Sequence, residues 1–410
     1  MGRCEMLWTT AGTNRVCSRC LALKGTVVGY TDESGVTLPP LHPRCRCAIE
    51  YREVGTPREQ NIKEQHHTLT LQSEQLETRW RALQSEIERL APQGTSPRLE
   101  ALYAEQQPIG DKLWETERNL RRIRLWAAEN NIILTTGLSR SLYVEDVAVI
   151  VEQVRKAPKN LQILWNMAEA DMKIIDKNFR ETAHYDLKRR GILFDAPEDF
   201  YNPTRKYKTI LHETGHLLDH FMGGQLYLHS YVYEGELFSK TLIEEANSAV
   251  KEELKRLKAE AVSLGRSSKN IKLADAQHSL SKTLQELDHA ARSEVSDIFS
   301  GVTKNKVKGG YYHENKYWRE AETLPTEAFA HMFCATIQSP ESLALIKKYF
   351  PKSYEMFEEM IDSWVQEKKL QWLGKNLIGK SSTAYKENMN DVLKKDFLLS
   401  KCHQMTSETR

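Results

Sequence analysis

The stretch TILHETGHLLDH, residues 209–220, decides how this chain is interpreted. Residues four apart lie on one face of an α-helix, so the imidazoles of His212 and His216 can converge on a single metal ion. Glu213 follows His212 directly and would lie beside that ion, where a carboxylate can take a proton from water. The pattern therefore predicts a zinc-binding helix that carries its own general base.

The residues around these histidines favour a buried helix over a surface helix with solvated histidines. Its apolar face would consist of Ile210, Leu211, Leu217, Leu218 and Phe221. Gly215 lies in the middle of the helix, where glycine costs about 1 kcal/mol relative to alanine. That cost is understandable if a second backbone packs closely against the glycine. We expect the helix to end near Gly223 and Gly224.

The third zinc ligand has two acidic candidates. Glu236 follows His216 by twenty residues, a thermolysin-like spacing, but Lys240 stands where a second acidic residue would be expected. Glu327 lies in LPTEAFAHMFCA, residues 324–335, which is typical of a helix start and has small alanines that let two helices approach. Glu327 is favoured; the alternative interpretation is a first-turn glutamate that interacts with the helix dipole.

Other residues near the motif limit the class of site. A metzincin would need glycine at position 219 and histidine at position 222, where this chain has Asp219 and Met222, so that class is excluded. Asp219 could orient an imidazole by accepting its second N–H. Helical drift swings His220 away from the metal, which favours a packing or outer role for it. GILFD, residues 191–195, fits an edge strand that binds peptide by strand addition.

The segment GGYYHENKYW, residues 309–318, concentrates tyrosines and a histidine shortly before Glu327. A tyrosine hydroxyl or an imidazole near the zinc could stabilise the oxyanion of a tetrahedral intermediate. We rank Tyr312 and Tyr317 as candidates for this role, with plain aromatic packing as the alternative for either one.

The cysteines indicate a second metal site near the N-terminus. Five of the seven cysteines lie in the first 47 residues, and this clustering favours a local site over a disulfide framework. Cys17 and Cys20 have the C-x-x-C spacing of zinc ligands, and Cys45 is the next choice, with His42 or Cys47 completing a tetrahedral set. Such a zinc would be structural, replacing the core that a fifty-residue unit cannot build. The alternative is reduced cysteines without metal.

Composition excludes several classes of function. The 58 basic and 56 acidic residues are mixed along the chain and leave a net charge of +2, so neither nucleic acid nor a membrane surface is an evident partner. The chain has no apolar run of 18 residues and no signal-peptide core at its N-terminus. We therefore expect neither a transmembrane segment nor a signal peptide.

The pattern of apolar residues predicts a helix-rich α+β chain in four parts. Residues 1–54 would form a small Cys-rich module of strands and turns, and residues 55–135 an antiparallel helical hairpin that turns at PQGTSP, residues 92–97. Residues 136–375 would form a zincin-like domain with a helical-hairpin insertion at about 240–295, made of helices near 242–264 and 273–299. Residues 376–410 read as a polar tail.

The N-terminal segment resembles one end of a phage protein family. WTTAGTNRVCSRCLALKG, residues 8–25, and LPPLHPRCRCAIEY, residues 38–51, are similar to the C-terminal end of Mu F-like head morphogenesis (minor capsid) proteins. In that family a Cys-x-x-Cys and a His-Pro-x-Cys-Arg-Cys close the domain. The similarity covers only about the first 52 residues, and the larger N-terminal part of the family's domain is missing from this chain.

The remaining chain resembles zincin-like metallopeptidase domains that are appended to phage minor head proteins, distant relatives of gluzincins of the anthrax lethal factor type. The resemblance rests on ILHETGHLLDH, on residues 297–318 and on TEAFAHMF. It implies His212, His216 and Glu327 as zinc ligands and Glu213 as general base. The assisting tyrosine of lethal-factor-like enzymes lies seven residues before the third ligand, a position that Glu320 occupies here.

Together these features lead us to expect a phage or prophage minor head protein that carries a zinc-dependent endopeptidase. Zinc would polarise the scissile carbonyl while Glu213 activates water and then protonates the leaving amine. Its partners would be a protein or peptide substrate and phage portal or capsid proteins, in the virion or the bacterial host cytoplasm. The alternatives are a non-catalytic structural virion component that retains a zincin fold, and a toxin-like metalloprotease effector.

Overall fold

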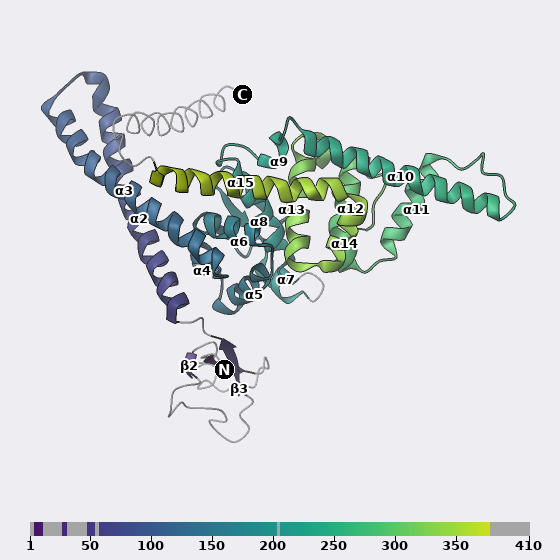
Figure 1. Ribbon diagram of the computed structural model, residues 1–410, viewed down its shortest axis with the longest axis horizontal. Coiled ribbons are helices and arrows are strands. Elements are labelled where there is room, and N and C mark those ends of the chain that lie inside the picture. The colour runs from purple at the N-terminus through teal and green to yellow at the C-terminus, as the bar shows by residue number, and fades with distance from the viewer. Residues whose placement is uncertain are drawn as a thin grey trace. The chain divides into compact units, whose positions relative to one another are not determined.

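The computed structural model describes the backbone of three strands near the N-terminus and of residues 57–202, 206–310 and 312–377, with side chains from 59 to 370 inside those ranges. The chain divides into two compact units, Met1–Glu358 and Glu359–Arg410, which are considered separately. The described residues are rich in helix and contain few strands, so the chain belongs to a helix-rich α+β class (Figure 1).

The N-terminal strands form a three-stranded antiparallel sheet in the order β2-β1-β3. Its strands are β1 (Cys4–Thr10), β2 (Val27–Tyr30) and β3 (Cys47–Glu53). Met6 pairs with Gly29 on one side and with Tyr51 on the other, and the register with β2 shifts after Met6. The strands expected in this region are therefore present.

Two long helices follow and pack against each other. They are α2 (Pro57–Leu90) and α3 (Pro97–Glu129), joined by the 3-10 helix η1 (Ala91–Gln93). α3 begins where Ser96 Oγ accepts a hydrogen bond from Leu99 N, with proline in the first turn. Their shared apolar seam consists of Leu83, Ile87, Leu99, Leu102 and Ile109. Ion pairs Arg79–Glu105 and Arg98–Glu86, both 2.9 Å, show that the two helices run in opposite directions.

The next segment carries short helices and a second small sheet. Its helices are α4 (Thr136–Ser139), α5 (Val144–Arg155), α6 (Lys159–Ala168), the 3-10 helix η2 (Glu169–Asp171), α7 (Ala196–Tyr201) and α8 (Lys208–Met222). Its strands are β4 (Ile174–Asp176), β5 (His184–Asp186) and β6 (Gly191–Leu193), in the order β4-β6-β5. β6 pairs parallel to β4 and antiparallel to β5.

The strand order corrects one expectation. GILFD, residues 191–195, was expected to form an edge strand, but β6 is central in its sheet and buried along its whole length. The edge strands are β4 and β5. Helix α8 contacts the edge strand β5 and the central strand β6. A strand buried on both sides has a continuous apolar sequence, which is why the Gly-Ile-Leu run lies in the middle.

The region after α8 is helical. It contains α9 (His229–Val232), α10 (Leu237–Ser263), α11 (Leu273–Gln285) and α12 (His289–Thr303). The single helix expected near 273–299 is thus two helices. Arg292 explains the break, because its guanidinium donates to the carbonyls of Gln285 and Leu287 and so takes the place of the next helical turn.

The last described helices are α13 (Thr323–Gln338), α14 (Pro340–Tyr349) and α15 (Pro351–Leu377), preceded by the 3-10 helix η3 (Tyr317–Arg319). α13 is almost entirely buried and packs against α8, α12 and α14 (Figure 1). It is the central helix of this part of unit 1.

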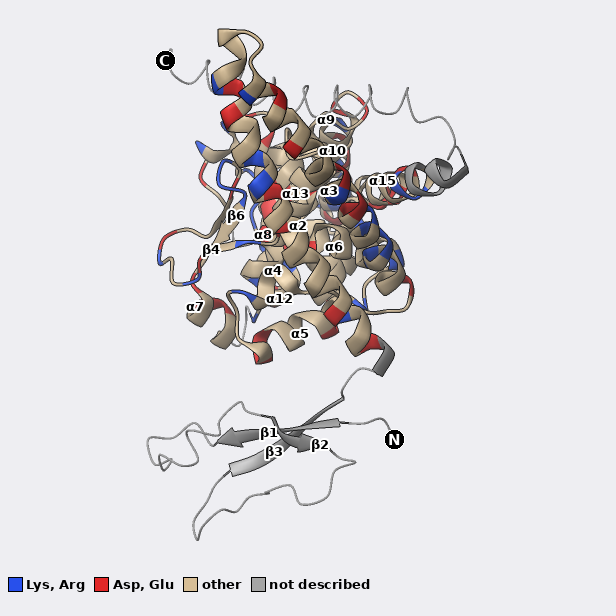
Figure 2. Ribbon diagram, turned by 90° about the vertical axis from the view of Figure 1, so that its left-hand side faces the viewer, with Lys and Arg blue, Asp and Glu red and all other residues tan. Residues whose placement is uncertain are grey.

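Charged residues follow the mixed pattern of the sequence. Figure 2 shows Lys and Arg interspersed with Asp and Glu along the described helices. Among the described residues, none of the helices has a stretch apolar and long enough to cross a bilayer.

Candidate metal centre

Helix α8 presents His212 and His216 on one face, as the motif spacing requires. Their ring centroids lie 4.9 Å apart with the ring planes almost perpendicular. The buried residues that hold α8 in place include Ile210, Leu211, Leu217 and Leu218. Tyr207, the residue before α8, provides no side-chain cap for the first turn of the helix. Instead, Asp199 of α7 accepts hydrogen bonds from Thr209 N (2.8 Å) and Ile210 N (3.1 Å).

Gly215 lets α13 approach α8 closely. A Cβ atom at this position would lie 2.7 Å from Ala330 Cα, closer than carbon atoms can pack. Ala330 lies three residues after Glu327, so the contact between the two backbones determines where the Glu327 carboxylate reaches α8. The glycine in the motif therefore has the packing role expected for it.

Glu327 is the carboxylate that meets the two histidines. His212 Nε2 lies 3.2 Å from Glu327 Oε2, and His216 Nε2 lies 3.5 Å from Glu327 Oε1. The Glu327 side chain is only 4% exposed. Tyr317 Oη donates a hydrogen bond to Glu327 Oε1. The structure thus brings together the three residues expected to be zinc ligands, from helices far apart in the sequence.

The electrostatics of the three residues are linked. Burial lowers the pKa of His212 to about 4, with the nearby His331 acting in the same direction, so His212 is neutral at pH 7. Burial also opposes charge on His216, but the Glu327 carboxylate outweighs it and raises the pKa of His216 to about 9. Burial would raise the pKa of Glu327, yet the two histidines hold it well below its usual range. Glu327 is therefore an anion whose charge is balanced by the His216 imidazole.

Glu213, the predicted general base, is buried next to the two histidines in the sequence of α8. It is 5% exposed, and burial raises the pKa of its carboxyl group to about 7. His216 and a hydrogen bond from the backbone of Tyr185 in β5 act in the opposite direction, while Glu327 adds to the rise. A carboxylate with a pKa near the working pH is well matched to proton transfer.

The two candidate tyrosines lie in different surroundings. Tyr317 contacts the Glu327 carboxylate through its hydroxyl and stacks on His313 with ring centroids 4.1 Å apart. Tyr312 is 42% exposed, and the Lys308 ammonium lies 4.2 Å from the centre of its ring. Among the described residues, no hydrogen bond joins Tyr312 to the proposed ligands. The structure therefore brings Tyr317 to the site but not Tyr312.

Among the described residues, three others from the motif region form no hydrogen bond or ion pair with His212, His216 or Glu327. Asp219 does not orient an imidazole: it is fully buried, and its carboxylate accepts from Ser230 N (2.7 Å) and Ser230 Oγ (2.6 Å). His220 is buried with its Nδ1 3.0 Å from Tyr185 Oη, a packing role. Glu236, the competing third ligand, is exposed at the start of α10.

Asp297 and His331 were missed as part of this site, whereas His313 is the imidazole that the sequence placed near it in GGYYHENKYW. Asp297 of α12 is fully buried, and its Oδ2 lies 2.9 Å from His313 Nδ1 and 3.0 Å from His331 Nε2. His331 Nε2 in turn lies 3.8 Å from Glu327 Oε2. The sequence did contain one signal, because His331 follows Glu327 by four residues and must share its helical face.

The residues around Glu327 offer the donor types of a zinc site. Among the described residues, the donor atoms that lie within 4.8 Å of one another are those of His212, Glu327 and His331 and those of Asp297, His313 and Glu327, while His216 meets the other oxygen of Glu327. Zinc bonds of 2.0–2.1 Å in a tetrahedral arrangement place neighbouring ligand atoms roughly 3.3 Å apart, near the separations of both imidazoles from Glu327. Glu327 Oε2 is buried and accepts no well-aligned hydrogen bond from the described residues. No Lys or Arg nitrogen in the described part of the chain lies within 4.0 Å of this carboxylate. A cation would satisfy this oxygen and take the place of the proton on His216.

The cysteine module cannot be placed in the same way. Cys17, Cys20, His42 and Cys45 lie outside the described residues. Cys47 is the first residue of β3, where only the backbone is described. The structural zinc stays a prediction.

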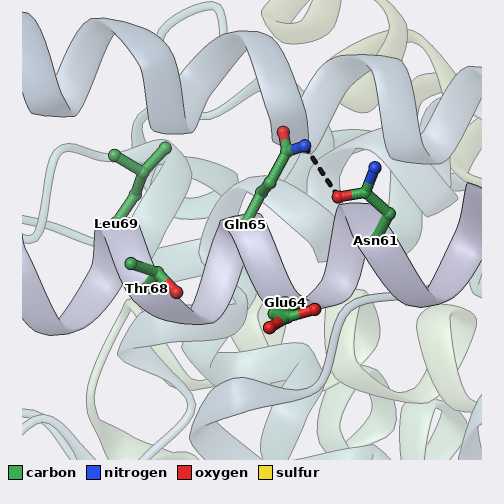
Figure 3. A pocket seen from close by; sticks show the side chains of 5 residues that line it. All are labelled: Asn61, Glu64, Gln65, Thr68 and Leu69. Atoms are coloured by element: carbon green, nitrogen blue, oxygen red, sulfur yellow. Dashed lines mark hydrogen bonds between the residues drawn. The ribbon is translucent and has the colours of Figure 1, made fainter.

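An open hollow on α2 has no comparable chemistry. Figure 3 shows the five side chains that line it, Asn61, Glu64, Gln65, Thr68 and Leu69. The two carboxamides satisfy each other, since Gln65 Nε2 donates to Asn61 Oδ1 at 2.8 Å. All five residues belong to one helix, and none is a proposed ligand.

Comparison with known protein families, with curated proteins and with solved structures finds no match for this chain.

Proposed function

We propose that this protein is a zinc-dependent endopeptidase of the gluzincin kind. The observation that supports it most is the meeting of His212 and His216 with the buried Glu327 carboxylate. Two imidazoles and one carboxylate are the ligand set of catalytic zinc sites that leave a fourth position open. The neighbouring Glu213 adds the acid–base group that peptide hydrolysis needs.

Bound zinc would supply a Lewis acid that polarises the scissile carbonyl and makes water more acidic. Two residues of the chain would carry out the proton transfer and the stabilisation of charge. Glu213 takes the proton of the attacking water and delivers it to the leaving amine, a role that its near-neutral pKa suits. Tyr317 donates its hydroxyl proton to Glu327 Oε1, and it would support the developing negative charge if this hydroxyl turned from Glu327 to the substrate oxygen.

We assign the enzyme to a phage or prophage minor head protein on the resemblance of residues 8–51 to Mu F-like head morphogenesis proteins. Its substrates would be capsid or scaffolding proteins. Co-expression with phage portal, capsid and scaffolding proteins, followed by analysis of their cleavage, tests this assignment. The two alternatives, a non-catalytic virion component and a toxin-like effector, predict no cleavage and cleavage of a bacterial host protein, respectively.

The full chain, loaded with zinc, tests the hydrolase itself. We would measure hydrolysis of a quenched-fluorescent peptide library and zinc content for the wild type, Glu213→Gln and Glu236→Gln. Loss of the general base should lower hydrolysis by about 10²–10⁴-fold and leave zinc in place. Glu236→Gln, an identical change at the exposed competing glutamate, should alter neither quantity. A zinc-loaded wild type that hydrolyses no better than Glu213→Gln would refute the enzyme.

A further inference from the structure

Asp297 connects two histidines through one carboxylate oxygen. Its side chain is 0% exposed, and its Oδ2 lies within hydrogen-bond distance of both His313 Nδ1 and His331 Nε2. The second oxygen, Oδ1, accepts from His313 N (3.1 Å) and from Ser300 Oγ (3.2 Å). Four contacts from three residues therefore fix the carboxylate in α12 and orient both imidazoles.

His331 is near enough to Glu327 and His212 to compete for the metal. Its ring centroid lies 4.5 Å from that of His212, and its Nε2 lies 3.8 Å from Glu327 Oε2. One donor atom each from His212, Glu327 and His331 all fall within 4.8 Å of one another. A small rotation of the His331 ring toward Glu327 would make it a ligand.

A fourth protein ligand would change the kind of site. Zinc with four protein ligands is closed and structural, whereas a catalytic zinc keeps one position open. His212, His216 and Glu327 leave that position open, and His331 would fill it. Something must therefore keep His331 Nε2 turned away from the metal, and in the structure this atom points to Asp297 Oδ2.

We propose that Asp297 is a positioning residue that holds His331 outside the metal's coordination shell and thereby keeps the fourth position open. This inference rests on the proposed function. It differs from the usual role of an outer carboxylate, which supports a ligand directly and whose loss lowers metal affinity about 10–100-fold. Asp297 acts on a histidine that is not a ligand, so its loss has the opposite effect on affinity.

The test compares zinc affinity and peptide hydrolysis in four full-length variants: Asp297→Ala, Asp297→Asn, His331→Phe and the double change Asp297→Ala/His331→Phe. Asp297→Ala frees His331, so zinc affinity should rise about tenfold while hydrolysis falls about 100-fold. The double variant lacks the competing imidazole, so its affinity should return to within about threefold of the wild type and its hydrolysis should recover at least about tenfold. Asp297→Asn keeps one acceptor oxygen and should lie between the wild type and Asp297→Ala.

Replacement of zinc by cobalt allows a spectroscopic measurement of the metal's ligands that does not depend on activity. The absorption bands of bound cobalt respond to the number and kind of ligands. They should change between the wild type and Asp297→Ala and return in the double variant. A fall in zinc affinity in Asp297→Ala would overturn the proposal, as would a double variant no more active than Asp297→Ala.

Two further outcomes would also overturn the proposal. If circular dichroism shows that Asp297→Ala does not fold, the His331→Phe variant decides the question. Its zinc affinity should stay within about threefold of that of the wild type. A loss of more than 100-fold would mean that His331 is a ligand and would overturn the proposal. Asp297, His313 and Glu327 also have donor atoms within 4.8 Å, so the loss of one whole equivalent of metal in Asp297→Ala would mean a second ion and overturn it too. Failure of the wild type to bind zinc would instead refute the proposed function.

Discussion

Two buried groups of histidine and glutamate occur in unit 1, and they differ in what balances the carboxylate. In the first, which we call the arginine cluster, His66 of α2 and Arg124 of α3 meet Glu169 of η2. His66 Nε2 lies 3.0 Å and Arg124 Nη2 3.8 Å from Glu169 Oε1, and Gly137 N donates to the other oxygen at 3.4 Å. The cluster joins the two long helices to the segment that follows them.

The second group consists of His212, His216 and Glu327, which we call the histidine site. In both groups the glutamate is almost completely buried, and in both one carboxylate oxygen lacks a well-aligned hydrogen bond. The difference is the permanent charge: a guanidinium lies beside Glu169, whereas imidazoles and the neutral Tyr317 hydroxyl lie beside Glu327 among the described residues. Arginine keeps its charge at any ordinary pH, but an imidazole can exchange its proton for a metal ion.

A buried histidine–carboxylate pair is therefore not by itself a metal site. The arginine cluster is complete, because its negative charge is already matched. In the proposed enzyme, a cation would take the place of a proton between Glu327 and its histidines. Changes to the two glutamates should therefore have separate consequences, one for metal binding and one for folding.

The largest expected effect is on metal binding. Glu327→Gln removes the charged ligand and should weaken zinc binding more than 100-fold, beyond what loss of an outer partner costs. Glu169→Gln makes the identical change in the arginine cluster and should leave zinc affinity unaltered. Isothermal titration of zinc into both metal-free proteins measures the difference. Equal losses in the two variants would contradict the distinction drawn between the clusters.

The next effect concerns stability. Glu169→Gln leaves Arg124 buried without its counter-charge, and breaking a buried pair in this way costs about 3–5 kcal/mol. Glu86→Gln is the matched control, because Glu86 pairs with Arg98 at 2.9 Å on the surface of the same helices, where an ion pair contributes about 0–1 kcal/mol. Urea unfolding of the two variants gives both free energies. A cost for Glu169→Gln as small as that for Glu86→Gln would show that the arginine cluster does not stabilise the fold.

A smaller effect tests how α13 reaches α8. Gly215→Ala would place Cβ 2.7 Å from Ala330 Cα, and such overpacking costs about 1–3 kcal/mol while moving Glu327 away from the histidines. Gly110→Ala in α3 is the control, since its Cβ would meet nothing closer than Trp80 Nε1 at 3.4 Å. There the better helix propensity of alanine should stabilise by about 1 kcal/mol. Urea unfolding and zinc titration check both; weaker zinc binding in Gly110→Ala as well would disconnect the effect from the helix contact.

Local patterns in the sequence predicted the helices better than they predicted the site's surroundings. The spacing of His212 and His216 and the glycine between them depend only on helix geometry, and α8 ends at Met222, next to the expected Gly223. The position of Glu327 was inferred from the small alanines beside it. These features are local, so the sequence alone contains them.

Other features depend on which segments meet in space. β6 is central because of how β4 and β5 pair with it, which an apolar run cannot indicate. Asp297 approaches His331 only because α12 packs against α13. Tyr317 rather than Tyr312 reaches Glu327 because of the path of the chain before α13, which the local sequence around either tyrosine does not indicate. Tertiary packing decides all three.

The smallest expected effect is a pH dependence confined to the arginine cluster. Burial would raise the pKa of Glu169, but His66 and Arg124 outweigh it and hold the pKa below its usual value. The stabilisation by this carboxylate is therefore fully present above the unfolded-state pKa of about 4.3 and is lost as the pH falls through the lower folded-state value. The difference in unfolding free energy between the wild type and Glu169→Gln should shrink from about pH 6 to about pH 3, because only the wild type has a group at this position to protonate. Other carboxylates titrate in both proteins and cancel in the difference. A difference that grows toward acid pH would mean that Glu169 is protonated in the folded protein near neutrality. The arginine cluster would then not hold its glutamate as an anion.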